Sequence, residues 1–150
     1  MKRMVLGLVL VASATAVASP ASGQAFGNAV VVDSDQLFVG EPVYDQRSGV
    51  VYVFSRDASG AWNQTQRLEP ASGEVQNRFG IRLAKQDDVL LVSATRADEG
   101  TGAVYVYRDQ DGTWSESGRI EVDNRSPADS LGSGLAIDGD WVMIGSISDY

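Results

Sequence analysis

GVVYVF at residues 49–54 and GAVYVY at residues 102–107 are two copies of one segment, 53 positions apart. Other residues recur with the same spacing of 52 or 53 positions. These are Phe26-Gly27, Phe79-Gly80 and Leu131-Gly132, then Asp35, Asp88 and Asp140, and also Arg67-Leu68-Glu69 and Arg119-Ile120-Glu121. Self-similarity at one fixed period is the signature of a repeat protein. The sequence therefore predicts repeats at about 26–78 and 79–130, and an incomplete third repeat at 131–150.

Each repeat contains four short segments of strand length, separated by turn residues. The predicted strands span 26–32, 37–40, 50–54 and 62–68 in the first repeat, and 79–85, 89–94, 103–107 and 113–121 in the second. The third strands, VVYVF and AVYVY, are apolar at successive positions, which predicts burial on both faces. No segment after residue 23 shows the periodicity of a helix, so we expect a meander of strands alone.

Four-stranded sheets that neighbouring copies cover on both faces are the blades of a β-propeller. We therefore expect an all-β fold, a partial β-propeller of four-stranded antiparallel blades, with about two and a half blades. A single β-sandwich is the weaker alternative, because its strands alternate between inward and outward residues. A complete ring at this period needs roughly 200–400 residues. We expect this chain of 150 residues to be a fragment that further blades of a longer chain complete, or the product of a truncated reading frame.

The N-terminus has the layout of an export signal. Lys2 and Arg3 precede an apolar run at residues 4–11, and Pro20 and the small residues 21–23 follow. A transmembrane anchor is the alternative, but the strongly apolar run is well short of the ~20 residues of a bilayer span. We expect a signal peptide at residues 1–23, a secreted repeat region at 24–150, and no membrane span in the mature chain. Three cleavage positions remain open, after Ala18, Gly23 or Ala25.

The composition excludes several classes of function. The chain has no histidine and no cysteine, so it lacks thiolate and imidazole nucleophiles and the usual ligands of zinc, haem and iron–sulfur clusters. Its 12 basic and 20 acidic residues give a formal net charge of −8. Because phosphate backbones and anionic lipids require clustered lysine and arginine, we expect no nucleic-acid partner and no membrane-surface partner.

A resemblance to a known family emerges from these residues. Phe26-Gly27, followed some twelve residues later by Val39-Gly40-Glu41-Pro42, resembles the FG-GAP repeat of integrin-α-type propellers. The GxVYVF…GxW half of each repeat resembles the longer FG-GAP-like repeats of secreted bacterial proteins. The resemblance covers about residues 26–150, and it implies a propeller that serves in interaction or adhesion. The glycine is expected to permit close approach of neighbouring backbones, while the aromatic residue fills the gap between blades.

The resemblance also implies a place for calcium, in the loop between the first two strands of a repeat. That position holds Asp33-Ser34-Asp35, Gln86-Asp87-Asp88 and Asp138-Gly139-Asp140. Each loop is too short to supply the 6–8 oxygen ligands of calcium, so we expect turn-forming aspartates and no metal or other cofactor. Asp109-Gln110-Asp111-Gly112 lies in the wrong hairpin for the family site, and its counterpart, Asp57-Ala58-Ser59-Gly60, has lost an acid.

No catalytic constellation is visible. The carboxylate pairs Asp87-Asp88 and Asp98-Glu99 are sequence neighbours; strand neighbours point to opposite faces, and we expect the second pair to be solvated loop charges. Leu131-Gly132-Ser133-Gly134 is not the nucleophile elbow G-x-S-x-G, and the nearby glycines lack the lysine and helix of a phosphate loop. We therefore predict no catalytic, cofactor-binding or metal-binding residues, and a protein that is not an enzyme.

Six aromatic residues recur at equivalent places in the repeats, which favours packing in or between blades over a carbohydrate platform. They are Tyr52, Phe54, Trp62, Tyr105, Tyr107 and Trp114. The loops at residues 43–48 and 96–101, which join the second and third strands, differ between repeats. Because scaffolds repeat and binding loops vary, we expect any binding surface to lie there.

The sequence favours a secreted, non-enzymatic interaction or adhesion module whose partner is a protein or a glycan at the cell surface. A second hypothesis is the N-terminal part of a secreted propeller enzyme that acts on an extracellular polymer, with its catalytic residues downstream. Both remain open at this stage, since a fold does not establish a function. A purely structural spacer is the third possibility, and it differs in having no binding that depends on the loops.

Overall fold

The computed structural model of the protein describes residues 25–43, 46–123, 126 and 129–147. The predicted signal peptide at residues 1–23 lies outside these ranges, as do the cleavage positions after Ala18 and Gly23. Among the described residues, no helix has the length and apolar character needed to cross a membrane.

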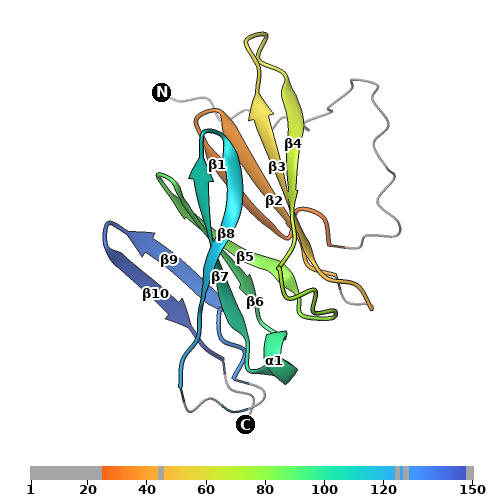
Figure 1. Ribbon diagram of the computed structural model, residues 1–150, viewed down its shortest axis with the longest axis vertical. Helices are drawn as coiled ribbons and strands as arrows, with labels where there is room; N and C mark the ends of the chain where they lie inside the picture. Colours follow the sequence, from red (N-terminus) through yellow and green to blue (C-terminus); the bar gives the residue numbers. More distant parts are fainter. Residues whose placement is uncertain (1–24, 44–45, 124–125, 127–128, 148–150) are drawn as a thin grey trace, which may run out of the picture.

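Two four-stranded antiparallel sheets and one hairpin make up the fold (Figure 1). The first sheet is ordered β1 (Ala29–Asp33), β2 (Gln36–Glu41), β3 (Val50–Arg56) and β4 (Trp62–Leu68). The second is ordered β5 (Phe79–Gln86), β6 (Val89–Ala94), β7 (Ala103–Gln110) and β8 (Thr113–Ile120). The hairpin pairs β9 (Gly134–Asp138) with β10 (Trp141–Gly145). Each sheet follows chain order, as propeller blades do, so the expected partial β-propeller fold is confirmed.

Two details differ from the sequence prediction. A short helical segment, α1 (Ala97–Gly100), lies between β6 and β7, although we expected strands alone. It has four residues, which is too short for a periodic apolar face to reveal it. The predicted first strand also begins too early, because residues 25–27 form a turn and β1 starts only at Ala29.

Backbone details recur with the period of the sequence. The glycine of each opening pair has a left-handed φ, which is 86° at Gly27, 86° at Gly80 and 91° at Gly132. The third and fourth strands of both sheets carry a bulge at the same place. There the hydroxyl of Thr65 donates to the carbonyl of Val53 at 3.3 Å, and that of Ser117 donates to Val106 at 3.1 Å. The two sheets are therefore copies of one unit, in structure as well as in sequence.

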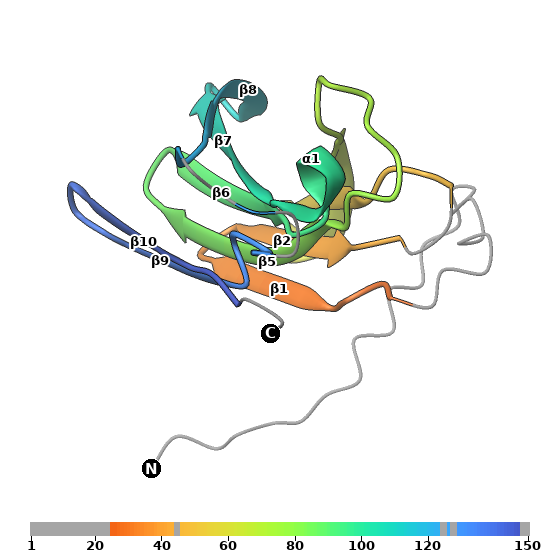
Figure 2. The same cartoon turned by 90° about the horizontal axis from the view of Figure 1, so that it is seen from below.

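Neighbouring repeats are in contact at the residue pair that opens each repeat, Phe79-Gly80 or Leu131-Gly132. This pair packs against the backbone of the preceding repeat. Strand β5 lies against β1 and β2 on one side and against β9 on the other (Figure 2). A Cβ atom added at Gly40 would lie 2.1 Å from the carbonyl oxygen of Gly80, and one at Gly49 would lie 2.0 Å from that of Phe79. At the next junction, a Cβ at Gly102 would lie 2.4 Å from the backbone of Leu131. These glycines are required for close approach of backbones.

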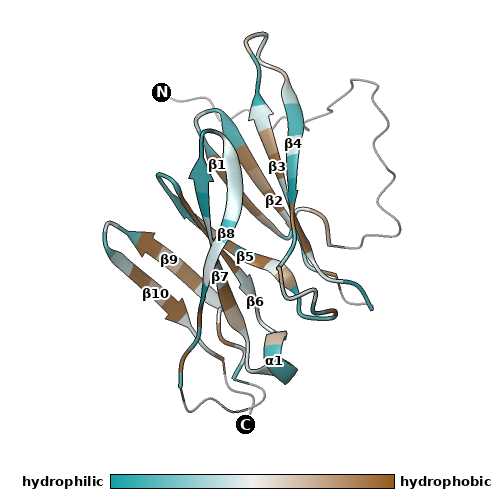
Figure 3. Cartoon of the chain, in the orientation of Figure 1, coloured by the Kyte–Doolittle hydropathy of each residue, from teal (hydrophilic) through white to brown (hydrophobic). Residues whose placement is uncertain are grey.

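The hydrophobic core fills the space between the two four-stranded sheets. The rings of Phe38 from β2 and Trp114 from β8 pack in a T-shaped arrangement, with centroids 5.1 Å apart. Phe79 packs against Tyr105 and Tyr107 at 5.4 and 6.1 Å. Figure 3 shows apolar residues along β2 and β3, and also along β9 and β10, where Trp141 and other side chains are exposed. The packing between repeats therefore supplies the core, as expected for blades.

Candidate functional site

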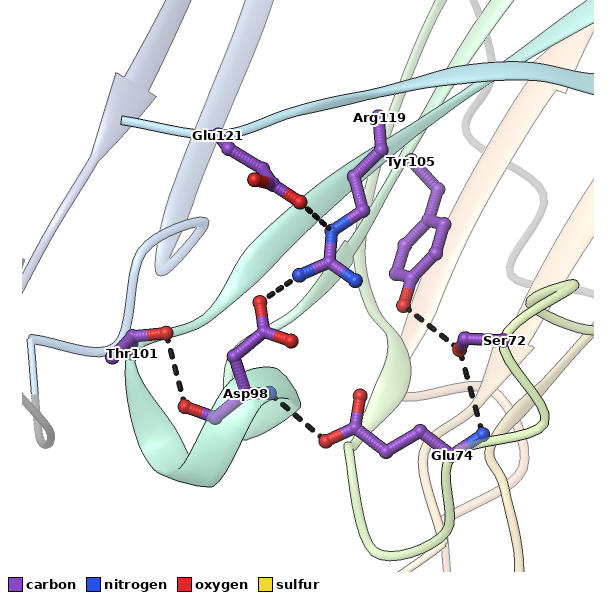
Figure 4. Close-up of polar contacts among 7 residues, drawn as sticks. All are labelled: Ser72, Glu74, Asp98, Thr101, Tyr105, Arg119 and Glu121. Atoms are coloured by element: carbon purple, nitrogen blue, oxygen red, sulfur yellow. Dashed lines mark hydrogen bonds and ion pairs between the residues drawn. The ribbon is translucent and has the colours of Figure 1, made fainter. Parts of the chain in front are cut away.

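The loop predicted to carry a binding surface, residues 96–101, lies within a cluster of polar side chains at one end of the second sheet (Figure 4). The segment that links the two sheets, residues 69–78, lies beside this loop, and the end of β8 completes the cluster. We call it the Arg119 cluster. Its members are Ser72, Glu74, Asp98, Thr101, Tyr105, Arg119 and Glu121.

The loop itself has a strained but well-anchored backbone. Asp98 and Glu99 have φ values of 51° and 59°, in the left-handed region that costs a non-glycine residue roughly 1–2 kcal/mol. Thr101 offsets this cost by donating from its backbone N–H and its hydroxyl to the carbonyl of Asp98, at 3.2 and 3.1 Å. Ala97 is fully buried beneath the turn. The loop is thus held in one shape, with Glu99 exposed at its tip.

Arg119, on β8, ties this loop to the sheet. Its guanidinium forms an ion pair with the carboxylate of Asp98, and its Nε lies 3.0 Å from Oε1 of Glu121. The guanidinium also lies over the ring of Tyr105, 5.4 Å from the centroid. Only 20% of the Arg119 side chain is exposed, so these interactions are less screened than those of a surface pair.

The linking segment closes the cluster from the other side. Glu74 accepts a hydrogen bond from the backbone N–H of Asp98 at 2.9 Å, and the hydroxyl of Ser72 lies 3.4 Å from that of Tyr105. Burial raises the pKa of Glu74 above its usual value, and the charge of Arg119 opposes that rise. Burial likewise raises the pKa of Tyr105, against the effect of the Ser72 hydroxyl. The cluster therefore fixes the loop, the link and the sheet relative to one another.

The chemistry of the cluster is that of a support rather than of a reaction centre. The carboxylates of Asp98 and Glu121 pair with Arg119, and that of Glu74 holds a backbone N–H. Asp98 and Glu99 lie on a turn and not on a strand, so the expectation that they are loop charges holds. Asp98, however, is not simply solvated, since it anchors the loop. The charged side chains exposed at the loop and the cluster are Arg96, Glu99 and Glu121.

The three loops predicted as turns without metal are two-residue hairpin turns. The residues that pair across them are Asp33 with Gln36, Gln86 with Val89, and Asp138 with Trp141. Side chains from β5 join neighbouring turns: Lys85 Nζ lies 2.5 Å from Oδ2 of Asp33, and Gln86 accepts from the N–H of Gly139 at 2.9 Å. Over the residues that the structure describes, no group of three or more histidine, cysteine, aspartate or glutamate side chains could hold a metal ion.

The other predicted turn residues lie at the same end of the molecule. Asp88 pairs with Arg108 at 3.0 Å, beside a shallow cavity of about 220 Å³ that Asp87 and Asp140 also line. Asp57 accepts hydrogen bonds from the backbone N–H groups of Ser59 and Ala61 and from the side chains of Ser59 and Asn63, at 2.6–3.0 Å. These bonds, that of the Ser59 hydroxyl first, lower the pKa of Asp57 to about 2. In the second repeat, Asp111-Gly112 forms a two-residue turn instead, between Gln110 and Thr113.

The recurring aromatic residues are buried in the second repeat and half-buried in the first. Tyr105, Tyr107 and Trp114 are 1–3% exposed, and they lie between the two sheets as the packing hypothesis expected. Gln66 of β4 binds both backbone groups of Trp114, at 2.8 and 3.2 Å. Tyr52, Phe54 and Trp62 are only half-buried, since they lie on the face of the first sheet that points away from the second.

Sequence reasoning located the loop but missed the residues that hold it. Arg119 and Glu121 were noticed only as markers of the repeat, and Ser72 and Glu74 were not singled out. The available signal was the recurrence of Arg-x-Glu at 67–69 and 119–121, because the arginine of each copy pairs with its own glutamate, at 2.8 and 3.0 Å. Glu74 carried no signal, since its contact with Asp98 bridges 24 positions.

Parts of this chain are similar to a known repeat family and to a known protein. A family model described as the FG-GAP repeat matches residues 62–107, which run from β4 through β5 and β6 to the middle of β7. The integrin alpha-2 subunit of Mus musculus is 34% identical over 91 residues, which is 53% of this chain. The chain spans 8% of the length of that subunit.

Proposed function

This chain carries an FG-GAP repeat of the integrin-α-like kind, and from that premise we propose that it acts outside the cell as a non-enzymatic interaction module. Its role is adhesion or recognition, and its partner is a protein or a glycan at a cell surface. The strand 2–3 loops form the binding surface, foremost residues 96–101. No metal or other cofactor takes part. The longer bacterial type of repeat stays a prediction.

One observation carries this proposal: the loop that varies between repeats is the one the Arg119 cluster holds in place. A binding loop gains affinity when it is ordered before its partner arrives, because less entropy is then lost on binding. The left-handed backbone of Asp98 and Glu99 also supports a binding role for this loop. Backbone strain persists only where the surrounding structure enforces it, and such residues cluster at functional sites.

The charges around the loop favour a basic partner surface. Glu74, Asp98, Glu99 and Glu121 outnumber Arg96 and Arg119 in this region, and the chain as a whole carries a net charge of −8. Complementary charge raises the rate of encounter and suppresses like-charged partners. A basic patch on an extracellular protein therefore fits the loop better than a neutral glycan does.

A pull-down of biotin-labelled surface proteins, run beside a glycan array, tests the proposal. Glu99→Arg reverses the charge at the loop tip, and Asp140→Arg makes the same change in the β9–β10 turn at the opposite end. We expect the first variant to lose bound proteins and the second to retain them. Equal binding by both variants would contradict the loop as the site. Turnover of an extracellular polymer that Glu99→Arg leaves intact would favour the enzyme alternative.

A further inference from the structure

Each junction between repeats has two sides. The later repeat contributes its opening pair and its first strand, and the earlier repeat contributes mainly its first two strands. Between the two four-stranded sheets, β5 therefore lies against β1 and β2, and Gly40 near the end of β2 leaves room for the backbone of Gly80. Both sides occur a second time in the described part of the chain, where no further repeat covers them.

The first repeat carries an uncovered copy of the later side, on the face of its sheet that points away from the second sheet. We call this face, which includes Phe26 and Val30, the outer face. Phe26 is 53% exposed, whereas its counterpart Phe79 is fully buried. Val30 is 52% exposed, whereas its counterpart Leu83 packs against the core. Gly27 has the left-handed φ of 86° that recurs in the next opening pair, yet a Cβ there would meet nothing within 4 Å.

The β9–β10 hairpin carries an uncovered copy of the earlier side. Its strands pair in the same register as β1 and β2, because Ala136 opposes Met143 as Val31 opposes Phe38. Phe38 is fully buried against the next repeat, whereas Met143 is 73% exposed. Trp141 lies two residues away on the same face of the strand and is 79% exposed. We call the surface of Trp141 and Met143 the hairpin face. It belongs to the two strands on which a later repeat packs most.

The hairpin also has a residue small enough for the close approach of backbones. Gly145 is the counterpart of Gly40, and each accepts a hydrogen bond from the opening glycine of its own repeat. The N–H of Gly27 donates to Gly40 at 3.0 Å, and that of Gly132 donates to Gly145 at 2.9 Å. A Cβ at Gly40 would lie 2.1 Å from the carbonyl oxygen of Gly80. Gly145 leaves the same space for the backbone of another opening pair.

We propose that copies of this chain associate head to tail, with the outer face of one copy on the hairpin face of the next. The Phe26-Gly27 pair and β1 then take the place on β9 and β10 that Phe79-Gly80 and β5 take on β1 and β2. Burial of the exposed apolar side chains drives the contact. The net charge of −8 on each copy opposes it, so salt that screens this repulsion strengthens the association.

The two surfaces differ, so the contact is heterologous, and a dimer keeps one free surface of each kind for a further copy. Val30→Asp places a charge on the outer face, and Met143→Asp places one on the hairpin face. Both side chains are exposed, so each variant should fold. By sedimentation velocity, we expect the unmodified full chain to form dimers and larger species as its concentration rises, and each variant alone to remain a monomer.

An equimolar mixture of the two variants separates this arrangement from a symmetric one. Each variant supplies the surface that the other lacks, so we expect a dimer of one copy of each and no larger species. A symmetric contact through the outer face would instead persist in Met143→Asp alone. A mixture that stays monomeric would overturn the proposal, as would association that both variants retain.

Val75→Asp is the matched control, because Val75 is also 52% exposed but lies in the linking segment, outside both surfaces. It should associate as the unmodified chain does. An unmodified chain that stays a monomer at every concentration, with and without added salt, would overturn the proposal without need of any variant. The 96–101 loop belongs to neither surface, so failure here is distinct from failure of the proposed function.

Discussion

The two four-stranded sheets have nearly the same sequence pattern and the same backbone, yet their side chains meet different surroundings. In β7, Tyr105 and Tyr107 are buried, whereas their counterparts in β3, Tyr52 and Phe54, are half-buried. The second sheet has the first beside this face, and in the described part of the chain the first sheet has no such neighbour. A blade therefore receives its core from its predecessor, as stability in repeat proteins comes largely from the interfaces between repeats.

The strand register shows how far the uncovered face extends. Val30, Val39, Tyr52 and Arg67 pair in one row across β1 to β4, so their side chains share a face. Val30 is 52% exposed, whereas its counterpart Leu83 is partly buried against the core, and Tyr52 is half-buried, whereas Tyr105 is 1% exposed. Val39 and its counterpart Val92 are buried in both sheets. The same residue types thus contribute differently to stability in the two repeats, and paired substitutions measure that difference.

The largest difference is expected between the two equivalent tryptophans. Trp114→Ala removes a side chain that packs on Phe38, and such losses cost about 3–5 kcal/mol of unfolding free energy. Trp62→Ala removes a half-buried side chain and should cost much less. Urea denaturation followed by circular dichroism measures both. Equal losses would mean that the second sheet does not depend on the first for its core.

The next largest loss of stability is expected for a substitution at the junction between the two repeats. Gly49→Ala places a methyl group 2.0 Å from the carbonyl oxygen of Phe79, which must force the two repeats apart at a cost of about 1–3 kcal/mol or more. Gly118→Ala is the matched control, because a Cβ there meets nothing within 4 Å. We expect a lower melting temperature for the first variant and little change for the second. An unchanged melting temperature for Gly49→Ala would show that the close approach is dispensable.

A smaller difference in stability is expected between substitutions of the two equivalent arginines, Arg119 and Arg67. Arg119→Met leaves Asp98 without its partner and removes the cation from the ring of Tyr105, for an expected loss of about 1–2 kcal/mol. Arg67→Met breaks a pair whose side chains are 49 and 45% exposed, which is worth about 0–1 kcal/mol. Limited proteolysis within residues 96–101 should accelerate only in Arg119→Met. Faster cleavage in both variants would refute a specific hold on the loop.

The fold was predictable because the residues that form the contacts between repeats recur in the sequence. Gly49 recurs as Gly102, and Gly80 recurs as Gly132, since a side chain at these positions would collide with a neighbouring repeat. The VYV cores recur since both faces of β7 are buried. The α1 turn was not predictable, because the left-handed conformation of Asp98 and Glu99 depends on the contact of Asp98 with Glu74, 24 positions away, as well as on the local bonds of Thr101.

The candidate site was predictable only as a place. Loop variation between repeats pointed to residues 96–101, but the members of the Arg119 cluster come from segments up to 49 positions apart, from Ser72 to Glu121. Asp98 looked like an ordinary solvated charge in the sequence, and its pairing with Arg119 arises only when β8 lies beside the loop. Single-sequence patterns do not contain such contacts.

The smallest difference in stability is expected for the turns between the third and fourth strands. In the first repeat the carboxylate of Asp57 accepts the hydrogen bonds of the turn, whereas in the second Asp111-Gly112 forms a two-residue turn. The pKa of Asp57 is lowered from 3.8 to about 2, so its ionised form stabilises the fold above pH 3.8 and that stabilisation is lost as the pH falls through about 2. Asp57→Asn should therefore lower the melting temperature slightly at neutral pH, and the deficit should vanish near pH 2. Asp111→Asn is the control, since asparagine suits the left-handed φ of 54° in its two-residue turn. A deficit for Asp57→Asn that persists near pH 2 would mean that the shape of the side chain, and not its charge, holds the longer turn.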